Sequence, residues 1–163
     1  MCIRDSNYGM SIARGEYVTF MDSDDYYGER ILSSFFEKYH KHPHVDFWKY
    51  GVVEHYIEHG ESLRDKINGV EDFVSSDATA IFRMALEMEY IPLFGSVCNG
   101  FYKRSIIEKY HIQFSAEYIM EDFMFSFEYL TYAESMGTIP HVYYHYMLCL
   151  LYTSPSPRDS WAS

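Results

Sequence analysis

An apolar run that ends abruptly in carboxylates constrains this chain more than any other stretch. Residues 17–21, YVTFM, are followed within four positions by Asp22, Asp24 and Asp25. Such a run is typical of a strand covered on both faces, as in a parallel sheet. The carboxylates then lie where the strand leaves the sheet, the end at which open α/β sheets bind ligands. Because neighbouring carboxylates repel one another, we expect a cation here, and a hard divalent metal suits oxygen ligands.

The rest of the chain alternates between helical and extended patterns. We expect helices over residues 7–13, 28–41 and 78–88, from 105 and from 121, strands over 16–21, 45–57, 96–102 and 138–147, and a loop over 58–70. Residues 75–77 offer N-caps, Ser105 and Glu108 form a capping box, and Gly137 closes the last helix. This order predicts an α/β fold with a mixed sheet flanked by helices.

The composition and charge of the chain exclude some classes of binding partner. The net charge of −11 argues against nucleic acid or an anionic membrane surface, but a metal ion could still bridge carboxylates to a nucleotide. No apolar run reaches the roughly 18 residues of a membrane span, and no signal peptide is visible. Three cysteines without metal-like spacing suggest reduced thiols. We expect a cytoplasmic protein, with peripheral attachment to the inner face of the membrane left open.

The two ends do not continue the neighbouring patterns. Residues 1–6, MCIRDS, and 149–163, CLLYTSPSPRDSWAS, resemble translated sequencing-adapter read-through. We therefore expect artefactual tails around a domain of residues 7–148. The alternative at the second end is a natural Ser/Pro-rich tail.

Two acidic motifs carry the candidate chemistry, and each has a simpler explanation. The Asp-x-Asp turn at Asp22 and Asp24 could be a solvated turn that caps the next helix. Glu121 and Asp122 open a helix, where its dipole favours carboxylates without any function. The functional interpretation is that one of this pair is a general base for a hydroxyl nucleophile. Neither motif decides the matter alone.

Several motifs in sequence order resemble family 2 glycosyltransferases, which have the GT-A fold. Residues 7–25, NYGMSIARGEYVTFMDSDD, resemble the signature in which an Asn-x-Gly helix and an Ala-x-Gly-Glu-Tyr strand entry precede Asp-x-Asp-Asp. Residues 99–107, NGFYKRSII, resemble an asparagine–lysine–leucine–tyrosine–arginine–arginine segment, with Gly100 where the family usually has lysine. Phe114 with Glu121 and Asp122 resembles an "F…ED" element, and residues 142–146 resemble a closing tyrosine-rich strand.

The resemblance implies a role for each acidic residue. Asp24 would ligate Mg²⁺ or Mn²⁺, Asp22 would contact the nucleotide-sugar directly or through the ion, and Asp25 would complete this donor-binding turn. Asp122 would be the catalytic base of an inverting transfer, with Glu121 contacting the acceptor or the base. The implied reaction moves a sugar from a nucleotide-diphosphate sugar to a hydroxyl of a saccharide or lipid-linked acceptor, in bacterial surface polysaccharide biosynthesis.

The chain departs from the family pattern at its start. These enzymes begin with a strand, a Pro-x-Tyr-Asn turn and an Asp-Asp-x-Ser segment, which hold the nucleotide, and none of these precedes Asn7. We therefore expect an incomplete GT-A fold that transfers no sugar by itself. Two other interpretations stay open: a non-catalytic carbohydrate- or protein-binding module of the same fold, and a metal-binding structural domain.

Overall fold

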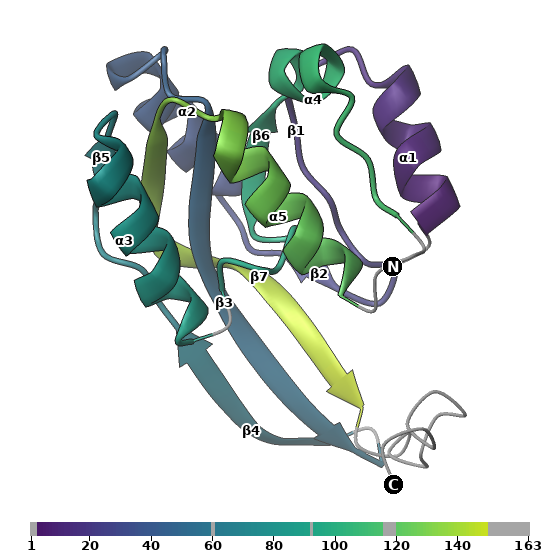
Figure 1. The fold of residues 1–163 in the computed structure, drawn as a ribbon. Helices are drawn as coiled ribbons and strands as arrows, with labels where there is room; N and C mark the ends of the chain where they lie inside the picture. The colour runs from purple at the N-terminus through teal and green to yellow at the C-terminus, as the bar shows by residue number, and fades with distance from the viewer. Residues whose placement is uncertain (1–2, 60, 92, 116–119, 150–163) are drawn as a thin grey trace, which may run out of the picture.

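The computed structural model describes residues 3–59, 61–91, 93–115 and 120–149, which form one seven-stranded sheet with helices on both faces (Figure 1). The helices are α1 (Ile3–Ile12), α2 (Ile31–Lys41), α3 (Ala78–Glu89), α4 (Arg104–Tyr110) and α5 (Glu121–Tyr132). The strands are β1 (Tyr17–Val18), β2 (Tyr26–Tyr27), β3 (Phe47–Glu58), β4 (Glu61–Asn68), β5 (Val74–Ser75), β6 (Gly100–Lys103) and β7 (Met136–Cys149). Of the tail expected over residues 149–163, only Cys149 lies within the described residues.

The sheet is mixed, as predicted. Its strand order is β1-β6-β3-β7-β2, with β4 paired to β3 and β5 paired to β7. Strands β3 and β7 run parallel, and the other pairs are antiparallel. The expectation that the first strand belongs to a parallel sheet was wrong, since β1 pairs antiparallel with β6 over only two residues. The chain leaves the ladder at Thr19, before it reaches the carboxylates.

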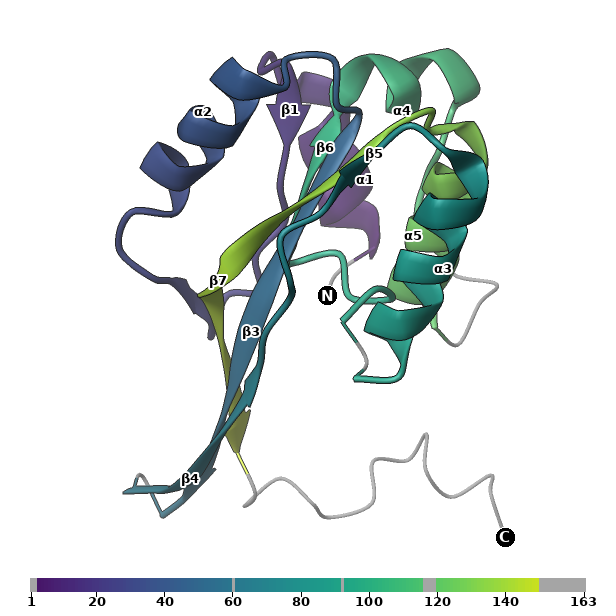
Figure 2. The ribbon, with the colours of Figure 1, turned by 90° about the vertical axis from the view of Figure 1, so that its left-hand side faces the viewer.

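Strand β3 is the centre of the molecule. Its first seven residues, Phe47 to Val53, are all buried, because helix α2 covers one face of the sheet and helices α3 and α5 cover the other (Figure 2). Aromatic rings fill both layers, with Trp48 and Tyr50 fully buried. A continuous buried run of this kind is what a strand covered on both faces requires.

The far halves of β3 and β7, together with β4, extend beyond the helices as a twisted ribbon (Figure 1). The prediction of a loop over residues 58–70 was therefore wrong. Strand β4 pairs with β3 from Asn68 to Glu61, and all its side chains except Asn68 are exposed. Because neither face of β4 enters the core, its sequence shows no apolar alternation, and its strand form comes from backbone pairing with β3.

Two predicted helix-end signals were also wrong. Helix α4 begins at Arg104 with Lys103 as its N-cap and no side-chain cap, so Ser105 and Glu108 do not form a capping box. Helix α5 ends at Tyr132, and Gly137 lies in β7 beneath Trp48, where no side chain fits. In contrast, Asp77 caps α3 as expected by accepting from the Ala80 N–H at 2.7 Å.

Candidate functional site

The acidic turn begins just after β1 and is anchored by Phe20. The Phe20 ring packs against Phe114 and Phe125 at centroid distances of 5.2 and 5.4 Å. The Asp25 N–H donates to the carbonyl of Asp22 at 3.2 Å and closes the turn. The apolar residue before the carboxylates therefore fixes the turn to the aromatic core.

The three aspartates of this turn have different environments. Asp25 is buried, and its carboxylate accepts hydrogen bonds from the Tyr144 hydroxyl and, at 2.8 Å, from the Met147 N–H. Burial raises the pKa of Asp25, and these two hydrogen bonds act against the rise. The Tyr144 hydroxyl also accepts from the Asp22 N–H at 3.1 Å. Asp25 thus ties the turn to β7, while Asp22 is half-buried and Asp24 is exposed.

Asp122 occupies the first turn of α5 and carries an unusual carboxylate. Its Oδ1 atom is buried without a hydrogen-bond partner among the described residues. Burial, followed by the neighbouring charge of Glu121 and that of Asp22, raises the pKa of Asp122 to about 6, against a smaller opposing effect of Lys49. A carboxyl group with a pKa close to neutral can both accept and release a proton near physiological pH.

One cavity of about 410 Å³ brings the acidic turn and Asp122 together, and we call it the aspartate cavity. Strands β3, β4 and β7 and the segment before β6 form its walls. It is lined by Asp22, Asp25, Val52, Glu54, Asn68, Leu93, Ser96, Cys98, Asp122, Tyr144, Tyr146 and Leu148. Two carboxylates that are far apart in sequence, Asp22 and Asp122, therefore line the same cavity.

The other two predicted site residues lie in neighbouring cavities. Asp24 lines a cavity of about 840 Å³ between the turn and α1, and Asp22 lines it as well. Glu121 lines a smaller one of about 270 Å³, which shares Asp122 and Ser96 with the aspartate cavity. Asp22 and Tyr146 therefore separate the first two cavities, and Ser96 and Asp122 separate the aspartate cavity from the smallest one.

Sequence reasoning missed the polar wall formed by β3 and β4. Glu54 accepts hydrogen bonds from Tyr56 at 2.7 Å, Lys66 at 3.1 Å and Asn68 at 2.6 Å. Burial opposes ionisation of Glu54, but these hydrogen bonds lower its pKa overall. The signal that could have revealed this wall was the charged Glu54 directly after the apolar pair Val52 and Val53.

The carboxylates fit a divalent metal only in a shared site. No group of three or more His, Cys, Asp and Glu side chains is arranged to hold a metal ion in the part of the chain that the structure describes. Asp25 is buried and bonded to β7, whereas Asp24 is exposed and Asp22 lines two cavities, so Asp22 and Asp24 are the carboxylates of this turn that a cation could reach. Magnesium and manganese commonly bind through one or two carboxylates together with substrate phosphates and water. The residues present fit that mode.

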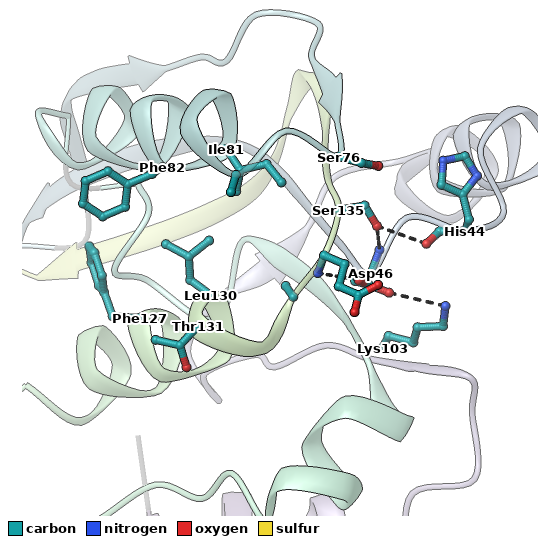
Figure 3. Close-up of a pocket in the computed structure, with 13 residues that line it drawn as sticks. His44, Asp46, Ser76, Ile81, Phe82, Lys103, Phe127, Leu130, Thr131 and Ser135 are labelled. Carbon is teal, nitrogen blue, oxygen red and sulfur yellow. Dashed lines mark hydrogen bonds and ion pairs between the residues drawn. The ribbon is translucent and has the colours of Figure 1, made fainter.

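A larger cavity of about 870 Å³ lies between α3 and α5, away from these residues (Figure 3). Its apolar part includes Ile81 and Leu130. At its polar end Asp46 pairs with Lys103 at 3.5 Å, and Ser135 bonds to the Asp46 N–H and to the His44 carbonyl. These polar groups bond to one another, and none of the predicted site residues lines this cavity.

Comparisons with known proteins identify the family and the fold of this chain. The family model described as glycosyl transferase family 2 matches residues 3–111, a stretch that contains the acidic turn and ends before Asp122. No curated protein sequence matches the chain. The helices of the described residues are too short or too polar to cross a bilayer.

Several solved structures share the fold. Staphylococcus aureus TarS 1–349 superposes with a TM-score of 0.64 at 18% identity, covering 89% of this chain and 40% of that one. TarS 1–349 in complex with UDP gives 0.61 at 20% identity, covering 97% and 41%. The complex with UDP-GlcNAc gives 0.57 at 20%, covering 86% and 37%. The chain thus spans about 40% of these TarS structures. On the family match, this chain belongs to glycosyl transferase family 2.

Proposed function

We propose that the full protein containing this chain transfers a sugar from a nucleotide-diphosphate donor to a hydroxyl acceptor in cell-surface glycan synthesis. The observation that carries the proposal is the aspartate cavity, in which Asp22 of the acidic turn faces the same space as Asp122. Family membership supports the reaction class. Structures of the same fold were solved with UDP and UDP-GlcNAc, which makes uridine nucleotides the first donors to test.

Asp122 is the proposed base. The acceptor hydroxyl gives its proton to the Asp122 carboxylate, and its oxygen forms a bond to the anomeric carbon of the donor sugar. The bond from that carbon to the diphosphate breaks, and the nucleotide diphosphate leaves with the electron pair. Direct displacement of this kind inverts the anomeric centre. A pKa of about 6 leaves Asp122 largely ionised, yet still basic, at neutral pH.

Asp24 and Asp22 are the proposed donor-side residues. They would hold Mg²⁺ or Mn²⁺ jointly with the donor diphosphate, and the bound ion neutralises the charge of the leaving group. Asp25 holds the turn in place through β7 and does not itself need to touch the ion. Glu121 contributes a second negative charge beside the base, which helps keep the pKa of Asp122 high.

The test is calorimetric titration of the full-length protein with UDP-sugars, in the presence and absence of Mn²⁺. We expect Mn²⁺-dependent binding in the wild type and at least a tenfold weaker affinity, or about 1.4 kcal/mol, in Asp24→Ala. Asp72→Ala is the matched control, because Asp72 is an exposed carboxylate paired with Lys38, outside the three cavities around Asp22 and Asp122.

Two results would contradict the proposal. If the donor binds Asp24→Ala as strongly as it binds the wild type, the acidic turn does not hold the metal ion. Glycan binding that needs neither metal nor nucleotide, with no transfer in a radiolabelled sugar assay, would instead identify a non-catalytic binding module.

A further inference from the structure

A lysine lies at the centre of the sheet, among aromatic rings. Lys49 of β3 is 0% exposed, and its ammonium group stands 5.3 Å from the Phe94 ring centroid and 5.4 Å from that of Tyr102. Burying an ammonium is unfavourable unless each of its protons has a hydrogen-bond acceptor. The structure supplies these acceptors from one short segment of the chain.

The Lys49 ammonium has four oxygens within hydrogen-bond distance, and three of them can only accept. It reaches the Phe94 carbonyl at 2.9 Å, the Ser96 carbonyl, and the Asn99 side-chain oxygen at 3.2 Å, with the Tyr102 hydroxyl at 2.9 Å as a fourth neighbour. Three acceptor-only oxygens match the three protons of an ammonium group. Burial lowers the pKa of Lys49 to about 7, and the negative charges of Asp122 and Glu89 oppose the fall.

These acceptors belong to a wall of the aspartate cavity. Residues 93–99 lie between α3 and β6 and form turns and bends without helix or strand pairing. Leu93, Ser96 and Cys98 of this segment line the cavity. Other hydrogen bonds help to hold it, including one from the Tyr50 hydroxyl to the Cys98 carbonyl at 2.9 Å. Lys49 bonds to the segment near its beginning, in its middle and at its end, and so fixes its path.

The residue opposite Lys49 is a glycine, Gly100, where a side chain would point into the same space. Lys49 pairs with Gly100 across the β3–β6 ladder, and side chains of directly opposed residues lie on the same face of a sheet. A Cβ atom at Gly100 would lie 2.9 Å from the Tyr102 ring and 3.1 Å from its hydroxyl, the same hydroxyl that Lys49 contacts. A side chain at either position is therefore directed towards the same space.

We propose that Lys49 is a positioning residue whose ammonium holds the 93–99 wall of the aspartate cavity. The effect on sugar transfer rests on the function proposed above, whereas the effect on the wall does not. Cys98 provides a direct measure of the wall, since its thiol is buried in that segment.

The test compares iodoacetamide labelling of Cys98 in native full-length protein, quantified by mass spectrometry of the Cys98 peptide. Lys49→Met leaves the carbonyls of Phe94 and Ser96 without their donor, so the segment should open more often and Cys98 should react about tenfold faster. Lys49→Gln keeps two donor protons, so its Cys98 should react at a rate between those of the wild type and Lys49→Met. Lys38→Met is the control, because it removes the same charge from an exposed ion pair with Asp72.

Gly100→Lys in the Lys49→Met background tests whether an ammonium placed at the residue opposite Lys49 can hold the segment in its place. It should slow the labelling again, and Gly100→Ala in the same background should not. If Lys49→Met folds, as judged by near-ultraviolet circular dichroism, and Cys98 stays protected, the proposal is wrong. If Lys49→Met does not fold, Lys49→Gln decides in its place, and wild-type labelling rates in that variant overturn the proposal. If the Lys49→Met, Gly100→Lys double variant labels as fast as Lys49→Met alone, an ammonium in this space does not hold the segment, and the role given to the ammonium is wrong.

Sugar transfer gives a separate readout. In full-length protein kcat should fall about tenfold in Lys49→Met, because the wall beside Asp122 is displaced, and should not change in Lys38→Met. Absence of transfer in the wild type would refute the proposed function and leave the labelling result intact.

Discussion

Replacing Asp122 with asparagine should make the protein more stable while removing its proposed base. Asp122 is half-buried, its Oδ1 atom is buried without a partner among the described residues, and its pKa is raised from 3.8 to about 6. That difference corresponds to about 3 kcal/mol of unfavourable free energy for the ionised form, at about 1.4 kcal/mol per pH unit. Asparagine carries no charge and avoids this cost.

Two effects reduce the expected gain. The asparagine amide must also be buried, at a cost of about 1 kcal/mol, and the first turn of α5 loses a carboxylate that its dipole favours by about 0.3–1 kcal/mol. The net gain for Asp122→Asn is then about 1–2 kcal/mol at pH 8. For a chain of this length that raises Tm by about 2–8 °C.

The gain depends on pH in a defined direction. Because the folded-state pKa of Asp122 lies above the unfolded one, the folded chain binds this proton more tightly. Wild-type stability therefore falls as pH rises from about 4 to about 6, and this contribution is constant above about pH 7. The difference in unfolding free energy between Asp122→Asn and wild type should be small at pH 4, increase between about pH 4 and pH 6, and stay constant from about pH 7 to pH 8.

Urea denaturation of both proteins at pH 4, 5, 6, 7 and 8 measures this difference, since other titrating groups cancel. Glu128→Gln serves as control, because it removes an exposed carboxylate from the same helix. A stability difference that does not change with pH, or a less stable Asp122→Asn at pH 8, would refute the reasoning. In the transfer assay Asp122→Asn should lose activity, and wild-type activity should fall as pH drops through about 6.

Two further variants test the packing around the site. Gly137→Ala should lose about 1–3 kcal/mol in urea denaturation, because its methyl group would meet the buried Trp48 ring at 2.3 Å and force it to move; unchanged stability would show that the ring can shift freely. Asp25→Asn should cost about 1–3 kcal/mol, since the amide replaces one acceptor of the two hydrogen bonds from β7 by a donor. Removing the exposed carboxylate of Asp24 should have little effect in the same assay, and equal losses at the two positions would contradict the different environments of the two aspartates.

The sequence was most informative where a local pattern matched a buried element. The fully buried start of β3 and the capped helix α3 both formed as predicted, because apolar periodicity and an N-cap act within a few residues. The acidic motifs that contain Asp22 and Asp122 were also visible in the sequence, and both residues line the aspartate cavity.

Other features depend on partners far along the chain. Asp24 and Asp25 look equivalent in sequence, yet only Asp25 is held by Tyr144 and Met147, more than a hundred residues later. Strand β4 has no apolar face and exists through its pairing with β3. The wall formed by Glu54 and Asn68 follows from that pairing, so it could not be predicted once residues 58–70 were interpreted as a loop.

The parallel pairing of β3 with β7 also constrains how the molecule can fold. Phe47 pairs opposite Met136, and the ladder continues to Ile57 opposite Cys149, so the central strand obtains this neighbour only after some ninety intervening residues. Closing loops of that size is slow, and contacts of high sequence separation are typical of slow-folding domains. During synthesis β3 would leave the ribosome well before β7, with one edge unpaired. Such an edge invites association with other chains, which makes this interval the stage at which a chaperone would help most.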